Sequence, residues 1–134
     1  MQIKRFLVFF FVSYIIGSVV AFSIDLINDI FLQSGFVVLI LYIYLPLHIL
    51  FFGWLYFRKA NHNFVRPQWN AIFVWMILMI ILDAIELRYL YGYKLSAFLI
   101  PSVYSQYVLN FGALVLAARI SKQNIQIVPD GMVK

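Results

Sequence analysis

Residues 71–87 read AIFVWMILMIILDAIEL, and this stretch decides the fold class. It carries no charge before Asp83 and is about as long as the shortest helix that crosses the hydrocarbon core of a bilayer, roughly 17–25 residues. It has neither a Gly nor a Pro, and it lacks the apolar–polar alternation typical of a barrel strand. We therefore expect a transmembrane helix over 71–87.

Three other apolar runs have a similar length, at 6–22, 36–57 and 98–118. A short amphipathic segment at 23–35, with Ser23 as a candidate cap, either lies at the membrane interface or extends the first helix. The polar tail over 120–134 is expected to fray. We therefore expect an all-α membrane protein, a single bundle of four transmembrane helices over 1–134 with no soluble domain.

The composition supports this class. The chain has 134 residues, of which 65% are hydrophobic and 11% are charged, whereas soluble domains have roughly 45–50% and 25%. These values exclude a disordered chain, a nucleic-acid module and an ordinary soluble enzyme. The absence of cysteine excludes disulfides and thiolate metal sites. We expect no nucleic-acid partner, because the cations lie at the ends of segments and not on one face.

The distribution of Lys and Arg predicts the orientation. With four spans, eight of the ten cations fall on one side of the membrane and two on the other. Because cytoplasmic loops are enriched in Lys and Arg, both termini should be cytoplasmic, and we expect the membrane to be the bacterial cytoplasmic membrane. The inner set is Lys4, Arg5, Arg58, Lys59, Arg66, Arg119, Lys122 and Lys134, and the outer set is Arg88 and Lys94.

Aromatic residues near the ends of the runs are expected to form belts at the two membrane surfaces, where amphipathic rings are favoured. The inner belt would contain Trp54, Tyr56, Trp69 and Trp75, and the outer belt Tyr89, Tyr91 and Tyr93.

Asp83 and Glu86 are the strongest candidates for chemistry. They are three residues apart and so share one face of the third helix. A carboxylate at mid-membrane costs at least about 2.5–3.5 kcal/mol, and such residues usually face a protein interior or a water-filled path. The functional interpretation is a proton-coupled or cation-binding site that opens to the outer side. In the structural alternative, Asp83 pairs with Lys94 and water hydrates Glu86.

His48 is the only ionisable residue deep in the second run, and Pro46 lies two positions before it. A proline inside a helix removes a hydrogen bond and tends to bend the helix. We interpret the pair as a candidate gate or proton relay. The structural alternative is a histidine hydrogen-bonded to a neighbouring helix.

Three other patterns are candidates for binding or packing. The outer surface should carry a charged cluster able to bind a charged headgroup or to form a solvated ion network: Asp25, Asp29, Arg88 and Lys94. Small residues every four positions predict close helix packing, within the bundle or at a dimer seam: Ser13, Gly17 and Ala21. The fourth run has a polar stripe that either lines a path or joins helices: Ser102, Ser105, Gln106 and Asn110.

No phosphate-binding loop, G-x-S-x-G or H-E-x-x-H motif is present, so an enzyme has little support, and no cofactor is expected. Our first functional expectation is an accessory or immunity-type subunit that binds the helices of a larger membrane partner. The alternative is an oligomeric small transporter, or a flippase of a lipid-linked substrate, that uses Asp83, Glu86 and the Pro46–His48 pair. The expected partners are the lipid bilayer and either further copies of this chain or that larger protein.

Overall fold

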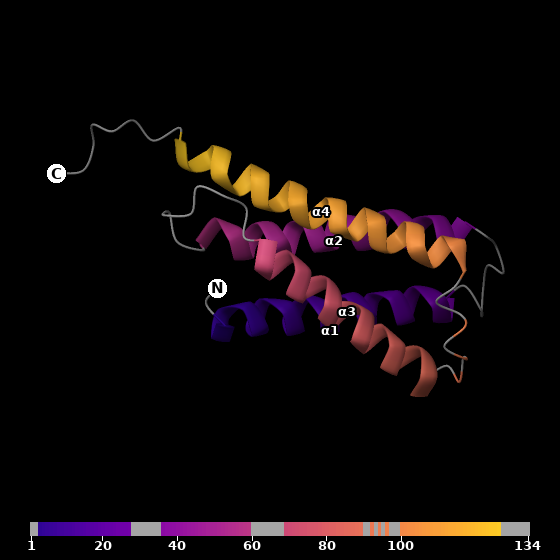
Figure 1. The fold of residues 1–134 in the computed structure, drawn as a ribbon. Helices are drawn as coiled ribbons and strands as arrows, with labels where there is room; N and C mark the ends of the chain where they lie inside the picture. The colour runs from indigo at the N-terminus through magenta and orange to yellow at the C-terminus, as the bar shows by residue number, and fades with distance from the viewer. Residues whose placement is uncertain are drawn as a thin grey trace.

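Four helices form the part of the protein that the structure describes. The computed structural model describes residues 3–27, 36–59, 69–89, 92, 94, 96 and 100–126. Within them lie α1 (Ile3–Ile27), α2 (Phe36–Lys59), α3 (Trp69–Tyr89) and α4 (Pro101–Gln126), as Figure 1 shows. The all-helical prediction is confirmed.

Three of the helices are long and apolar enough to cross a membrane: α1, α2 over Leu39–Arg58, and α3. This agrees with an integral membrane protein. Among the described residues, α4 is long enough but does not reach the same hydropathy, because Gln106 and Asn110 interrupt its apolar sequence and Arg119 lies near its end.

The helix ends differ from the expected bounds in two informative places. α1 continues to Ile27, so the first part of the 23–35 segment extends that helix. Ser23 does not cap a new helix; its hydroxyl donates to the Val19 carbonyl at 2.7 Å, one turn back. α4 begins at Pro101 and reaches Gln126. The helix therefore continues past 120, where the sequence predicted the start of the tail, and residues 127–134 lie outside the described part.

The bundle has two distinct ends. α2 runs alongside α4, α1 packs against α2, and α3 contacts both α4 and α1. In Figure 1, α3 is inclined to the other three helices and leaves α4 towards its own C-terminus. We call the end where α1 and α3 begin the aromatic end, and the end where α2 and α4 begin the pocket end.

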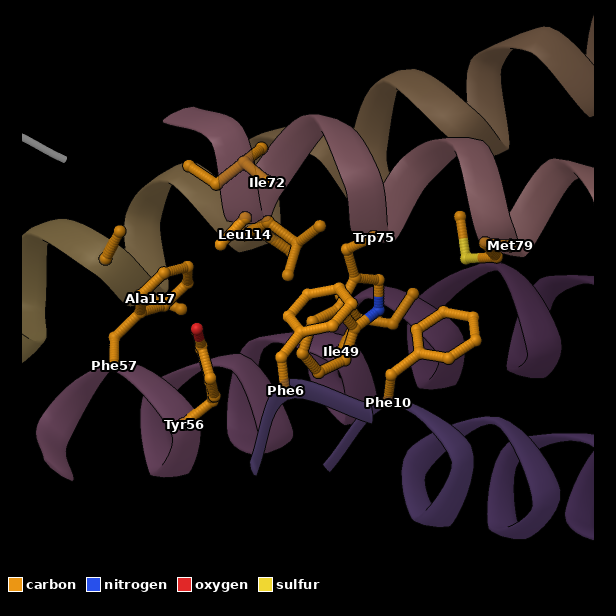
Figure 2. Packing of buried hydrophobic residues seen from close by; sticks show 13 residues of the cluster. Phe6, Phe10, Ile49, Tyr56, Phe57, Ile72, Trp75, Met79, Leu114 and Ala117 are labelled. Atoms are coloured by element: carbon orange, nitrogen blue, oxygen red, sulfur yellow. The ribbon is translucent and has the colours of Figure 1, made fainter. Parts of the chain in front are cut away.

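Aromatic side chains fill the aromatic end (Figure 2). Trp75 of α3 meets Phe6 and Phe10 of α1 edge-on, with ring centroids 5.7 and 5.6 Å apart. Tyr56 of α2 adds a fourth ring, 5.7 Å from Phe6. All four side chains are buried. Edge-to-face pairs of this kind contribute about 0.5–1.5 kcal/mol beyond their buried area, so this cluster joins three helices firmly.

The expected inner belt is therefore only partly correct. Tyr56 and Trp75 point into the bundle and not towards headgroups. The Arg58 guanidinium lies 5.0 Å from the ring centroid of Trp54. Position near a helix end predicts depth in the membrane, but it does not predict which way a ring points.

Gly53 allows α2 and α4 to approach closely. A Cβ atom at this position would lie 3.2 Å from both the Ala117 Cβ and the Leu114 Cδ2, closer than most carbon contacts in proteins. The absence of a side chain at Gly53 therefore sets the spacing of this helix pair, in the manner of small residues at membrane helix interfaces.

Candidate functional site

A pocket of about 390 Å³ lies between the four helices at the pocket end. Every helix contributes polar side chains to its wall: Ser13 from α1, His48 from α2, Asp83 and Glu86 from α3, and Asn110 from α4. The three ionisable residues that the sequence predicted inside the spans thus surround one space.

Glu86 is held from α1. The Tyr14 hydroxyl donates to its Oε2 at 2.7 Å, and the Ser18 hydroxyl donates to the same oxygen at 3.2 Å. Tyr14 and Ser18 are four residues apart and so present their hydroxyls on one face of α1. Glu86 therefore has protein partners, where the structural alternative foresaw only water.

Asp83 is held from α4. The Tyr107 hydroxyl donates to its Oδ2 at 2.8 Å. Asp83 and Glu86 both line the pocket. Lys94, the partner foreseen in the structural alternative, is exposed. The two carboxylates thus form one acidic site whose described partners are neutral hydroxyls.

Each carboxylate keeps acceptor capacity. The hydrogen bonds described above all end on Oε2 of Glu86 and Oδ2 of Asp83. An ionised carboxylate offers about four lone-pair positions on its two oxygens. Within the described residues, no fully buried side-chain oxygen or nitrogen lacks a partner. The carboxylate lone pairs that the protein does not use therefore face the surrounding space and are not enclosed in the core.

His48 joins α2 to α1. Its Nε2 lies 2.9 Å from the Ser13 carbonyl oxygen and 3.3 Å from the Ser13 hydroxyl, and its Nδ1 lies 3.1 Å from the Tyr44 hydroxyl. Because a carbonyl only accepts, Nε2 carries a proton and donates it to Ser13. This is the contact with a neighbouring helix that the structural alternative foresaw, made at the wall of the pocket.

The small residues of α1 face inward. Ser13 and Gly17 are buried, and a Cβ at Gly17 would lie 3.5 Å from the His48 Nε2. Ala21 also lines the pocket. Of the two interpretations of this stripe, packing within the bundle therefore describes Ser13 and Gly17, whose small side chains leave room for the His48 ring.

The residues of the polar stripe of α4 make different kinds of contact. The Gln106 amide donates to Asn110 Oδ1 at 3.3 Å, and the Asn110 amide lies 3.9 Å from the Met79 sulfur. Both residues line the pocket. The Ser102 carbonyl accepts from the Tyr42 hydroxyl at 3.0 Å, which joins α2 to α4. Ser105 instead turns back to backbone carbonyls of its own helix and is exposed.

The remaining candidates do not enter the pocket wall. α2 is continuous through Pro46, so the proline does not end the helix. Asp25, Arg88 and Lys94 are exposed, and none of them lines the described pocket. Asp29 lies outside the described residues. The structure therefore separates the intramembrane acids from the expected outer charged cluster.

Two residues of α1 that belong to the site were missed in the sequence, Tyr14 and Ser18. Apart from the small-residue stripe, the first run is apolar on every side, so its sequence does not indicate which helix Tyr14 and Ser18 meet. The four-residue spacing of the two hydroxyls was the available signal. It becomes informative only once Glu86 is known to lie opposite.

A scan against protein-family models found no match, and searches of curated proteins and of solved structures found no significant match to this chain.

Proposed function

We propose that this chain spans the membrane four times, with both termini in the cytoplasm of a bacterium. α4 runs alongside α2, so a bilayer that covers α2 also covers α4. The cations agree with this orientation. Lys4, Arg58 and Arg119 are exposed towards the aromatic end, and Arg5 lies there as well, donating to the Tyr56 carbonyl at 3.1 Å. The aromatic end would then be cytoplasmic and the pocket would occupy the outer half of the membrane.

Within this arrangement, we propose that the protein is a small transporter that works as an oligomer and uses Asp83 and Glu86 to bind a cation. The cation is either the substrate itself or a proton that drives transport. One observation carries the proposal: both carboxylates line a space between four helices that the protein does not fill. Carboxylates inside a membrane are costly and usually mark a substrate or ion pathway.

The volume of the pocket separates this proposal from a purely structural network. The pocket is partly open to the surface of the bundle and so is accessible to a ligand. Hydrogen bonds that only joined helices would need no space of about 390 Å³ beside them. The accessory-subunit interpretation, in contrast, was favoured by the lack of any defined site in the sequence. The pocket therefore supports the transporter more strongly.

Transport also requires a path from the pocket to the cytoplasmic side of the membrane. The aromatic cluster of Phe6, Phe10, Tyr56 and Trp75 fills the bundle on the cytoplasmic side of the pocket. α3 makes fewer contacts with its neighbours than α2 does. A change in the inclination of α3, supported by a second copy of the chain, is the simplest movement that would open this side.

Proteoliposomes test the proposal. The vesicles carry an imposed pH gradient and a pH-sensitive dye, and quaternary ammonium, primary amine, zwitterionic and anionic compounds are added in turn. We expect one of these classes, exchanged for protons bound at the acidic site, to accelerate the loss of the gradient above protein-free vesicles. Asp83→Asn and Glu86→Gln should abolish this effect, and Asp25→Asn, which alters an exposed carboxylate, should not. No effect of any compound, or equal effects in all three variants, would contradict the proposal.

A further inference from the structure

We infer that the ligand of the pocket is a compact amphipathic ammonium, a primary or secondary amine on an apolar body, bound between Asp83 and Glu86. This inference names the ligand class of the site proposed above and rests on that proposal. Three features of the pocket support it: the two carboxylates in its wall, the absence of Lys and Arg from its described lining, and its volume.

The acidic wall favours an ammonium with N–H donors. Asp83 and Glu86 lie one turn apart and face the pocket together, and each keeps lone pairs that the protein does not use. Hydrogen bonds with an ionised partner are about twice as strong as those between neutral groups, and an ammonium adds the attraction of its own positive charge to the carboxylates. A quaternary ammonium has no N–H group and is usually bound by an aromatic cage. The hydroxyls of Tyr14 and Tyr107 instead point at the carboxylates.

The opposite wall disfavours a negative charge on the ligand. Leu41, Leu45 and Ile49 of α2 line this side of the pocket. No Lys or Arg lines the pocket as described, and protein groups engage both ring nitrogens of His48. No free cation is thus placed to bind a carboxylate or a phosphate. An amino acid or a phosphorylated headgroup would bury an unpaired negative charge, which is costly.

The size excludes a bare metal ion. Pockets that hold organic ligands fall in a range of about 300–1,000 Å³, and this pocket of about 390 Å³ lies near the lower end. A bare ion would leave most of its apolar wall uncovered. No group of three His, Asp or Glu side chains able to hold a metal was found among the described residues. The size fits a small organic amine.

Five probes with one phenyl ring and a short chain separate these requirements. They are 2-phenylethylamine, its N,N,N-trimethyl derivative, phenylalanine, 3-phenylpropanoate and 2-phenylethanol. Binding to the purified full chain in detergent is measured by calorimetry, with sodium and magnesium chloride alone as further ligands. We expect 2-phenylethylamine to bind about 10–100-fold more tightly than each of the others, the range expected for hydrogen bonds to a charged group.

Variants assign the binding to the pocket. Glu86→Gln and Asp83→Asn keep the size of each side chain and should each weaken the binding of 2-phenylethylamine about tenfold or more. Asp25→Asn should leave the binding unchanged. Circular dichroism and the elution volume of each variant establish that it is folded. Should a carboxamide variant fail to fold, Leu45→Trp fills the apolar wall and should block binding while both carboxylates remain.

The results can contradict the inferred ligand class and the proposed transporter separately. Selective binding of the amine without transport supports the inference and contradicts the transporter. Transport with a preference for phenylalanine, 3-phenylpropanoate or the trimethyl derivative overturns the inference and leaves the transporter standing. Binding that is equal for all probes, or equal in Glu86→Gln and the wild-type chain, also overturns the inference.

Discussion

The Tyr14 hydroxyl of α1 donates a 2.7 Å hydrogen bond to Glu86 Oε2 of α3, across 72 positions of sequence. The contact links the first helix to the helix that carries both intramembrane acids. Ser18 reinforces it from one turn further along α1. α1 therefore holds Glu86 in place at the pocket wall.

Tyr14→Phe should destabilise the protein. The substitution keeps the ring and removes the shorter of two hydroxyl bonds to a carboxylate, a loss of about 1–3 kcal/mol for a charged acceptor. Unfolding of the purified protein by added sodium dodecyl sulfate measures the change. Tyr104→Phe is the matched control, because Tyr104 is an exposed tyrosine of α4. Equal stabilities of the two variants would contradict the role assigned to Tyr14.

Three helical glycines should respond differently to alanine. A Cβ at Gly53 meets Ala117 and Leu114 at 3.2 Å, a Cβ at Gly17 meets His48 at 3.5 Å, and a Cβ at Gly112 meets nothing within 4 Å. Alanine favours a helix over glycine by about 0.8–1.0 kcal/mol, whereas overpacking costs about 1–3 kcal/mol.

We therefore expect Gly112→Ala to be neutral or stabilising, Gly17→Ala to lie near neutral, and Gly53→Ala to be destabilising. Unfolding midpoints of the three variants measured under one condition give this order. A Gly53→Ala variant as stable as Gly112→Ala would show that α2 and α4 are not closely apposed.

The two tryptophans of α3 should differ in importance. Trp75 is 2% exposed and packs between Phe6 and Phe10, whereas Trp69 is 40% exposed and contacts Phe111. Replacing a buried Trp by Ala typically costs about 3–5 kcal/mol. Trp75→Ala should lose this much, and Trp69→Ala less than half of it. A larger loss for Trp69→Ala would contradict the aromatic cluster as the main packed region.

The absence of cysteine from the chain makes its topology directly testable. Single substitutions Lys4→Cys, Lys94→Cys and Arg119→Cys place one thiol each at exposed positions. In intact cells, a membrane-impermeant maleimide should label only the Lys94→Cys variant. All three should react after the cells are opened. Labelling of Arg119→Cys from outside would place the end of α4 on the wrong side and exclude the four-span orientation.

Parts of the fold and site were readable in the sequence for clear reasons. Runs free of charge predicted helices, and the spacing of Asp83 and Glu86 correctly placed both on one side of α3. A charged residue in an apolar run signals inward orientation by itself, because lipid does not solvate it.

The partners of these acids were not readable. The small-residue stripe of α1 predicts a packing face, but nothing local indicates that Tyr14, beside this stripe, meets Glu86. The same holds for Trp75, whose position near a helix end suggested a membrane surface although it is buried. In water, polar residues mark the outside of a helix. In lipid that contrast is absent for a helix without charged residues, and packing between helices decides which face turns inward.

The central claim is that Asp83 and Glu86 give an accessible pocket a negative potential. Val103 lines this pocket on α4, whereas its neighbour Tyr104 is exposed and does not line it. The decisive measurement is the reaction rate of a single thiol at each position, Val103→Cys or Tyr104→Cys, with cationic and anionic thiosulfonates of similar size. The account predicts a larger cation-to-anion rate ratio for Val103→Cys, lost when Asp83→Asn and Glu86→Gln are added. Equal ratios at the two positions, or a ratio unchanged by those substitutions, would contradict it.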